Sequence, residues 1–249
     1  MPAGSVRPTG PTCLGALVAL AAAIAVGALV FTLWPGLDLG VSRLAYRPGA
    51  GFVLADRPVW DAVVLAGKVA SILYVTAALV LLPASLLRRA DPAVARYWGL
   101  VILLYLIGPG LMVNGALKRG FGRARPDQIE LFGGDGPFTA AWQVSGYCRS
   151  ACSFVSAEVA AGTALTIGLA LGALWFAGRP AARLFRRLAL AALALLVLTA
   201  LQRIGSGRHF LSDVVFAILL VAALGTTLAC LLRPRQMPYL TPHRTGDLP

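Results

Sequence analysis

A histidine and an aspartate near the C-terminal end of the chain have the spacing of a catalytic pair. His209 and Asp213 are four residues apart, so both lie on one helix face if a helix begins near them. A carboxylate can accept a hydrogen bond from one imidazole nitrogen and orient the other nitrogen for nucleophilic attack. Arg203 lies six residues before His209. The alternative is an ordinary polar loop, but the pairing of His with Asp favours chemistry.

A basic segment in the middle of the chain has the residues to bind an oxyanion. Residues 118–126 read Lys-Arg-Gly-Phe-Gly-Arg-Ala-Arg-Pro, and Lys118 and Arg125 are seven residues apart. In a helix, that spacing would place both cations on nearly the same face. Two such cations suit the oxygens of a phosphate group. The alternative is a juxtamembrane basic patch that touches anionic lipid headgroups.

A third cluster combines small polar residues with an isolated acid. Residues 148–158 read Cys-Arg-Ser-Ala-Cys-Ser-Phe-Val-Ser-Ala-Glu and precede a long apolar stretch. The free backbone N–H groups at the start of a helix form an anion site. Glu158 would lie about one turn inside the helix, where an acid is costly and therefore indicates a function. The alternative is a structural glutamate that pairs with an arginine.

The composition identifies the environment in which these clusters work. Of the 249 residues, 58% are hydrophobic and 13% are charged, whereas soluble domains carry about 25% charged residues. This excludes an ordinary soluble enzyme, a disordered chain and a fibrous chain, and it indicates an integral membrane protein. The net charge of +12 does not indicate nucleic acid, because the arginines lie in short loops between apolar stretches.

The apolar stretches predict an all-α polytopic membrane protein, a bundle of about six transmembrane helices. Each stretch is long enough to cross a hydrocarbon core of about 30 Å. Residues 13–232 would form this membrane domain, between a cytoplasmic N-terminal tail at 1–12 and a cytoplasmic C-terminal tail at 233–249. The predicted spans are 13–34, 62–87, 97–117, 154–177, 188–205 and 211–232.

With six spans, the three clusters must lie on the same side of the membrane. The loops after the third and the fifth span share one side, and the fourth span begins there. Basic residues are almost evenly divided between the two sides, so the rule that positive loops stay inside decides little by itself. If the clustered cations serve chemistry, the remaining charges place the termini in the cytoplasm and the clusters outside it, facing the periplasm.

The three clusters together resemble the type 2 phosphatidic acid phosphatase family. The family pattern begins with a Lys, six residues and an Arg-Pro pair, which Lys118, Arg125 and Pro126 match. Its third part is Ser-Arg, five residues, His, three residues and Asp; Arg203, His209 and Asp213 match it, with Gln202 in place of the Ser. Of the second part, Pro-Ser-Gly-His, only the Ser is kept, in residues 155–158.

The resemblance implies a role for each matching residue. His209 would attack phosphorus and form a phosphohistidine, and Asp213 would orient it. No metal ion and no other cofactor would be needed, because cations of the protein would neutralise the phosphate charge. The phosphate would be held by Lys118, Arg125, Arg203, Ser156 and the amide of Ala157.

Glu158 stands where the family has a second His, which protonates the leaving alkoxide. A glutamate can do this only if its environment favours the protonated form. The runs at residues 121–126 and 152–158 resemble a bacterial subgroup of this family associated with lipid A phosphatases. This resemblance implies a phosphorylated lipid as substrate in the bacterial inner membrane, with lipid A phosphate the leading candidate. The alternatives are undecaprenyl diphosphate or phosphatidylglycerophosphate hydrolysis, phosphoryl transfer to another lipid, and an inactive relative that binds lipid.

The four cysteines fall into two groups. Cys13 and Cys230 lie at or in apolar stretches, and we expect each to be a small buried side chain. Cys148 and Cys152 share one loop at a spacing that permits a disulfide if the loop lies outside the cytoplasm. The sequence leaves that bond open.

Overall fold

The chain folds into an all-α membrane bundle, as the sequence predicts. The computed structural model describes residues 13–89, 91–149 and 152–232, so the two predicted tails lie outside the described residues. Within these described residues, six helical segments are long and apolar enough to cross a membrane. They are α1 (Cys13–Leu33), α3 (Pro58–Leu87), α4 (Pro92–Tyr105) with its continuation, α6 (Ala157–Trp175), α7 (Pro180–Gly205) and α8 (Leu211–Leu232).

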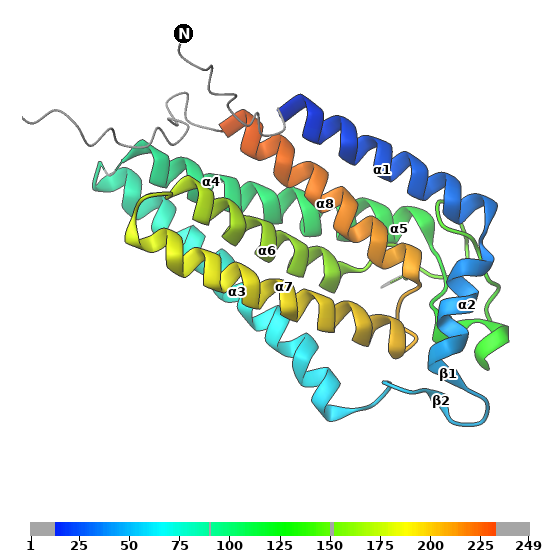
Figure 1. Ribbon diagram of the computed structural model, residues 1–249. Coiled ribbons are helices and arrows are strands. Elements are labelled where there is room, and N and C mark those ends of the chain that lie inside the picture. The colour runs from blue at the N-terminus through cyan, green and yellow to red at the C-terminus, as the bar shows by residue number, and fades with distance from the viewer. Residues whose placement is uncertain (1–12, 90, 150–151, 233–249) are drawn as a thin grey trace, which may run out of the picture.

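The third span is built from three helical pieces. After Tyr105, α4 widens into a π-helical segment, Leu106–Leu117, which contains Pro109. Proline removes a backbone donor and disturbs the regular helix, which accounts for the change of pitch. The segment runs directly into the short helix α5 (Lys118–Phe121), which carries the basic cluster to one end of the bundle (Figure 1).

Helix starts differ from the predicted spans where proline sets them. The helices α3, α4 and α7 each begin at a proline, whose fixed φ suits the first helical position. The largest difference is α7, which starts at Pro180 rather than at residue 188. Its first turns carry Arg183, Arg186 and Arg187. Arginines can extend their charged ends toward the interface while their stems stay on the helix, so an apolar run underestimates its length.

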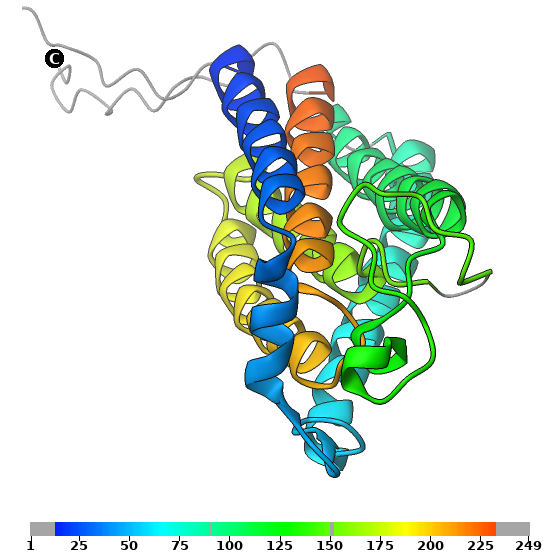
Figure 2. The same ribbon diagram turned by 90° about the vertical axis from the view of Figure 1, so that its right-hand side faces the viewer.

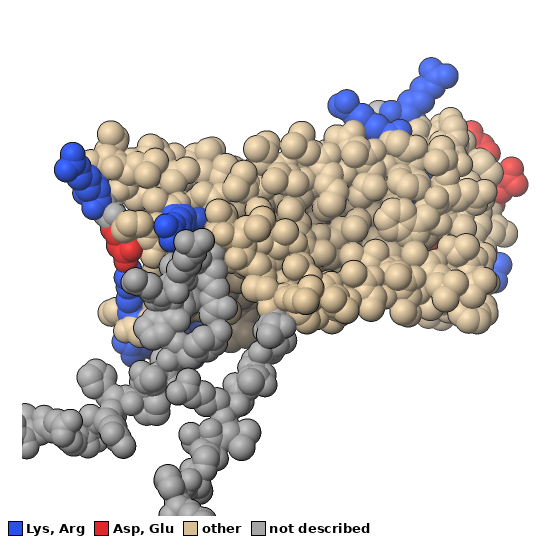
Figure 3. Space-filling model, turned by 90° about the horizontal axis from the view of Figure 1, so that it is seen from above, with Lys and Arg blue, Asp and Glu red and all other residues tan. Residues whose placement is uncertain are grey.

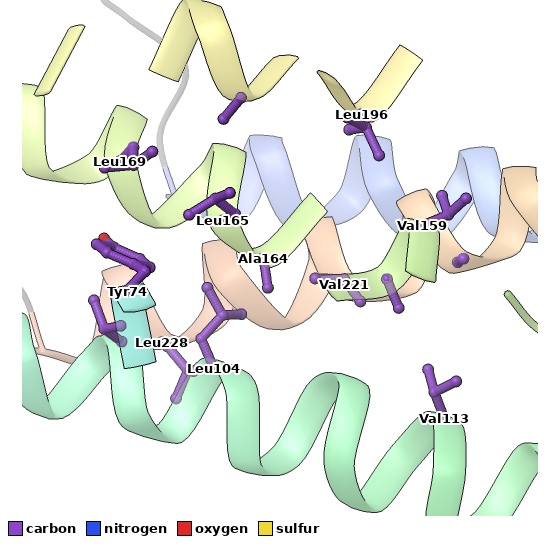
Figure 4. Packing of buried hydrophobic residues seen from close by; sticks show 14 of the residues in the cluster. Tyr74, Leu104, Val113, Val159, Ala164, Leu165, Leu169, Leu196, Val221 and Leu228 are labelled. Carbon is purple, nitrogen blue, oxygen red and sulfur yellow. The ribbon is translucent and has the colours of Figure 1, made fainter. Parts of the chain in front are cut away.

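The helix α6 is the most buried span, and α1 is the least buried. Figure 4 shows Ala164 and Leu165 of α6 among side chains from neighbouring spans, including Leu104, Leu196 and Val221. Many leucines on the other helices are exposed, as lipid-facing positions require. On the side seen in Figure 3, charged residues gather toward the two ends and an uncharged band lies between them.

The polar end of the bundle is built by the loops between the spans. Between α1 and α3 lie a short helix, α2 (Gly36–Ala45), and a hairpin of β1 (Tyr46–Arg47) and β2 (Gly51–Phe52), which pair antiparallel. The connection from α5 to α6 contains two short 3₁₀ turns, Pro126–Gln128 and Glu130–Phe132. Figure 2 looks onto this end, where α2 and the long loop lie over the spans.

The expectation for Cys13 and Cys230 is wrong. The structure joins them in a disulfide with a Cα–Cα distance of 6.0 Å, and Cys13 is exposed. The reason is the antiparallel packing of α1 on α8, which brings the first residue of one helix beside the end of the other. Cys148 and Cys152 are also joined, with a Cα–Cα distance of 5.6 Å, at the opposite end of the bundle.

Candidate active site

All three sequence clusters meet at the end of the bundle that carries α2 and the hairpin. Span α4 with α5 ends there, α6 and α8 begin there, and α7 ends there. The site is therefore assembled from the ends of four spans rather than from one continuous segment. The predicted site residues at this end are Lys118, Arg125, Ser156, Ala157, Glu158, Arg203, His209 and Asp213.

The cations at the site come from two different spans. Lys118 is buried, and its Nζ donates a hydrogen bond to the carbonyl of Cys152 at 3.2 Å. The like charges of Lys118, Arg125 and Arg203 act on one another. Because such repulsion is relieved when an anion binds, the arrangement suits a phosphate group.

The basic cluster is not one continuous helix, so the shared helix face that its spacing would allow for Lys118 and Arg125 does not form. The helix α5 ends at Phe121, and Gly122 adopts a left-handed conformation with φ of 56°. A Cβ atom at Gly122 would lie 2.1 Å from the carbonyl oxygen of Ser145, so only glycine fits this turn. Arg125 then follows in extended backbone. The two cations share the site because the chain turns back, not because they share a helix face.

His209 lies in the tight connection between α7 and α8 and is fully buried. Its Nδ1 lies 2.8 Å from the carbonyl oxygen of Ser153. A carbonyl oxygen can only accept, so Nδ1 must carry the proton, and in neutral His209 the lone pair is then on Nε2. Nε2 has no hydrogen-bond partner among the described residues. This is the arrangement that a nucleophilic imidazole requires.

Asp213 lies in the first turn of α8 and is fully buried. Its Oδ2 is 3.6 Å from Nδ1 of His209, which is longer than a hydrogen bond. The same oxygen accepts from the hydroxyl of Ser153 and from the N–H of Phe210. Asp213 therefore contacts Ser153 and Phe210 rather than His209 itself. The direct hydrogen bond to Nδ1 of His209 is made by the carbonyl of Ser153.

Glu158 lies in the first turn of α6, close to the imidazole of His209. Its Oε2 is 3.7 Å from Nε2 of His209, and its Oε1 is 3.6 Å from Arg203 and 3.7 Å from Lys68. Oε2 itself has no hydrogen-bond partner among the described residues. A protonated carboxyl group here could give a proton to an oxygen atom of a group bound beside Nε2 of His209.

The start of α6 is fixed by Ser156. The Ser156 hydroxyl accepts from the N–H of Val159 at 3.4 Å, as a helix cap does. Its own N–H donates to the carbonyl of Asp213 at 3.3 Å. Ala157, half-buried, follows as the first residue of the helix. Ser156 thus ties the start of α6 to the start of α8.

Sequence reasoning missed four residues that the structure brings to the site. Lys68 pairs with Glu158, and a lone lysine inside an apolar span was the signal that could have found it. Ser153 holds both His209 and Asp213, but a serine in a loop gives no such signal. The other two, Arg123 and Asp38, form a buried ion pair at 2.8 Å. Burial raises the pKa of Asp38, and the charge of Arg123 opposes this rise.

Gln202, which replaces the serine of the family pattern, supports its neighbour. It is almost fully buried. Its Oε1 accepts from Arg203 at 3.4 Å, and its Nε2 donates to Asp61 at 3.3 Å. The amide therefore links Arg203 to α3, which helps to hold the guanidinium at the site.

Three buried polar atoms of the predicted site residues lack a hydrogen-bond partner among the described residues: Nε2 of His209, Nε of Arg203 and Oε2 of Glu158. Unsatisfied buried groups are costly, and their presence together marks a place where a polar ligand would bind. Within residues 13–89, 91–149 and 152–232, no three His, Cys, Asp or Glu side chains gather as a metal site would require.

Comparison with known proteins gives one family match and several similar relatives. The model of the PAP2 superfamily matches residues 98–237, a range that includes all three clusters. The lipid A 4'-phosphatase of Rhizobium leguminosarum is 42% identical over 112 residues, 44% of either chain. The lipid A 4'-phosphatase of Francisella tularensis subsp. novicida is 36% identical over 113 residues, 44% of this chain and 46% of the relative. These matches span less than half of each relative's length. No solved structure gave a significant match.

Proposed function

The chain belongs to the PAP2 superfamily, and from this premise we propose that it is an integral membrane phosphatase that hydrolyses a phosphorylated lipid. The names of its relatives make lipid A phosphate the leading substrate. The observation that carries the proposal is the position of His209. Its unpartnered Nε2 lies beside Glu158, at the end of the bundle where Lys118, Arg125 and Arg203 gather.

In the first chemical step, Lys118, Arg125 and Arg203 bind the phosphate oxygens and spread its charge. The lone pair of Nε2 of His209 attacks phosphorus, and the bond between phosphorus and the lipid oxygen breaks. Glu158 gives its proton to the departing alkoxide, so the lipid leaves as an alcohol. The protein is then a phosphohistidine at Nε2, and Glu158 is a carboxylate.

In the second step, a water molecule attacks phosphorus and breaks the bond to Nε2. Ionised Glu158 takes a proton from that water, which restores the acid for the next turnover. Inorganic phosphate leaves, and His209 returns to its neutral form with the proton on Nδ1. The carbonyl of Ser153, 2.8 Å from Nδ1, supports this scheme because it keeps the lone pair on Nε2.

One observation favours a different role for Glu158. Its Oε1 lies 3.6 Å from Arg203 and 3.7 Å from Lys68, and a carboxylate between two cations can act as a tie between helices. If Glu158 only holds α3, α6 and α7 together, the leaving alkoxide must take its proton from water. This is also the observation that favours the inactive, lipid-binding alternative.

For the location, we propose the bacterial inner membrane, with the active site facing the periplasm and both termini in the cytoplasm. The six apolar helices support a multi-pass membrane protein. With the catalytic cations set aside, the remaining basic residues favour the end of the bundle away from the site as the cytoplasmic end. No metal ion takes part in the proposed reaction, because protein cations bind the phosphate.

The test is phosphate release from purified lipids in detergent. The panel contains lipid A, undecaprenyl diphosphate, phosphatidylglycerophosphate and phosphatidic acid, each with and without EDTA. We expect release from lipid A that EDTA does not reduce, and inhibition by vanadate, which adopts the five-coordinate geometry of the transition state. Absence of release from every lipid would refute the phosphatase. Activity that EDTA abolishes and magnesium restores would refute the metal-independent mechanism.

A further inference from the structure

A buried arginine connects the site to a helix that lies outside all three sequence clusters. Arg123 is only 1% exposed, although it lies between Lys118 and Arg125 in the basic segment. Its guanidinium donates to Asp213 at 2.7 Å and to Asp38 of α2 at 2.8 Å. Its Nε donates to the carbonyl of Thr139 at 2.9 Å. Its Nη1 also donates to the hydroxyl of Ser212 at 2.9 Å, so four of its five N–H groups already have acceptors within the protein.

Asp38 also fixes the first turn of α8. Its Oδ1 accepts from the N–H of Ser212 at 2.8 Å, and its Oδ2 accepts from the Ser212 hydroxyl at 2.6 Å. A carboxylate at a helix start satisfies N–H groups that have no partner within the helix. Asp38 is itself fully buried. The helix α2 thus holds the turn that carries Asp213.

The same contacts leave Asp213 only one orientation. Its Oδ1 accepts from Arg123, and its Oδ2 accepts from the hydroxyl of Ser153 and the N–H of Phe210. Ser153 in turn places its carbonyl 2.8 Å from Nδ1 of His209. A continuous chain of hydrogen bonds therefore runs from Asp38 through Arg123, Asp213 and Ser153 to His209.

Packing adds to this restraint. The Arg123 guanidinium lies 4.2 Å from the ring centre of Phe210, the residue that follows His209. Buried ion pairs cost desolvation free energy, so they contribute little to stability compared with apolar packing. Their value lies in fixed geometry, because a partner cannot move without leaving a buried charge unpaired.

We propose that Arg123 and Asp38 are positioning residues, which hold Asp213 and Ser153 so that Nε2 of His209 points at the bound phosphorus. Neither residue contacts the substrate. The inference rests on the proposed phosphatase reaction, but it concerns how His209 is held rather than which lipid is hydrolysed. It predicts that the pair affects attack on phosphorus and not the binding of a phosphate anion.

The first test measures turnover and KM for three variants. Asp38→Asn keeps the size of the side chain and removes one of the two carboxylate charges paired with Arg123. Because a small misplacement of a reacting group lowers the rate about 10²-fold, we expect kcat to fall by about that factor with KM nearly unchanged. Ser212→Ala leaves every charge paired and should show a smaller loss of the same kind. The control is Asp91→Asn, which breaks an exposed pair with Arg179 at the other end of the bundle and should leave kcat unchanged.

The second test measures binding without turnover. Vanadate can take Nε2 of His209 as a fifth ligand, whereas inorganic phosphate needs only the cations. We expect Asp38→Asn to weaken vanadate binding at least about 10-fold and to leave phosphate binding unchanged. Equal losses for both anions, or no loss for vanadate, would overturn the positioning role. If Asp38→Asn does not fold, the same comparison on Ser212→Ala decides.

These measurements separate the inference from the proposed function. A wild-type protein that releases no phosphate from any lipid, yet binds vanadate in a manner that requires His209, would refute the phosphatase. The vanadate and phosphate comparison would still decide the role of Arg123 and Asp38. A wild-type protein that does not bind vanadate at all would overturn both.

Discussion

At the scale of single residues, the hydrogen bond between Nδ1 of His209 and the Ser153 carbonyl makes a sharp test of the nucleophile possible. In His209→Asn, the side-chain amide can still donate to that carbonyl, but no nitrogen lone pair remains to attack phosphorus. We expect turnover to fall by about 10⁴-fold or more, because the covalent route is lost. Phosphate release by purified variant and wild type measures the effect.

His209→Ala is the matched variant, because it removes both the nucleophile and the hydrogen bond. If the bond to Ser153 only supports the fold, the two variants should differ in thermal unfolding and agree in their loss of turnover. Activity close to wild type in either variant would disprove the phosphohistidine mechanism.

Glu158 is the second residue whose role can be separated by kinetics. If it protonates the leaving alkoxide, Glu158→Gln should lower turnover of a lipid substrate by about 10²–10⁴-fold. The loss should be much smaller for a nitrophenyl phosphate, because that leaving group departs without a proton. Glu158→His should recover part of the activity, since it restores the residue of the family pattern.

The control variant for Glu158 is Lys68→Met. It removes the ion-pair partner that lies 3.7 Å from Oε1 of Glu158, and it leaves the carboxyl group in place. A Glu158 that only ties helices together would give equal losses for good and poor leaving groups, and Lys68→Met would then reproduce the effect of Glu158→Gln. That outcome would remove Glu158 from the catalytic residues.

At the scale of elements, the connection between α7 and α8 depends on Gly207. Its φ is 71°, and a Cβ atom there would lie 2.4 Å from the ring of Phe52 in β2. We expect Gly207→Ala to cost about 1–3 kcal/mol of stability through the backbone alone. The clash should also displace His209, two residues later, so turnover should fall in protein that remains folded.

Gly178→Ala provides the comparison for Gly207→Ala. Gly178 has a similar φ of 82°, but no atom lies within 4 Å of an added Cβ, and it lies at the end of the bundle away from the site. Thermal unfolding in detergent should show destabilisation of both variants, and kcat should fall only for Gly207→Ala. A decrease in kcat of equal size in both would mean that the contact with Phe52 does not position His209.

The helices also differ in how far the sequence could predict their positions. The spans follow from apolar runs, and the loops that carry Lys118 and His209 share one side because six crossings require it. The position of Asp38 does not follow in this way. It meets Arg123 across 85 residues and Ser212 across 174 residues, and only the path of α2 over the end of the bundle brings them together. Local sequence patterns do not predict this path, because it depends on how distant parts of the chain pack together.

The family pattern has a similar limit at the site. It predicted that Asp213 would orient His209, because their spacing is fixed along the chain, but the two side chains lie 3.6 Å apart and share no hydrogen bond. It could not show that the carbonyl of Ser153 makes the direct hydrogen bond, since any residue offers a carbonyl there and the contact depends on backbone geometry. Residue type predicts which groups gather, whereas backbone position decides which of them touch.

At the scale of the whole molecule, the two cysteine pairs report on its orientation. Cys148 and Cys152 lie at the end of the bundle with the active site, and Cys13 and Cys230 lie at the opposite end. In the proposed location, the inner membrane separates these ends into two compartments, of which the periplasm is oxidising and the cytoplasm is reducing. The oxidation state of each pair in cells therefore depends on which end faces outward.

With the active site in the periplasm, Cys148 and Cys152 should be bonded in cells. Cys13 and Cys230 are joined in the structure, but the reducing cytoplasm should keep them as thiols in cells. Cells are denatured in an alkylating reagent before and after reduction, and the labelled peptides are measured by mass spectrometry. Purified protein treated with an oxidant is the control, and it should form both bonds because both Cα pairs lie within 6.0 Å. If only Cys148 and Cys152 are labelled before reduction, the active site faces the cytoplasm and the proposed orientation is wrong.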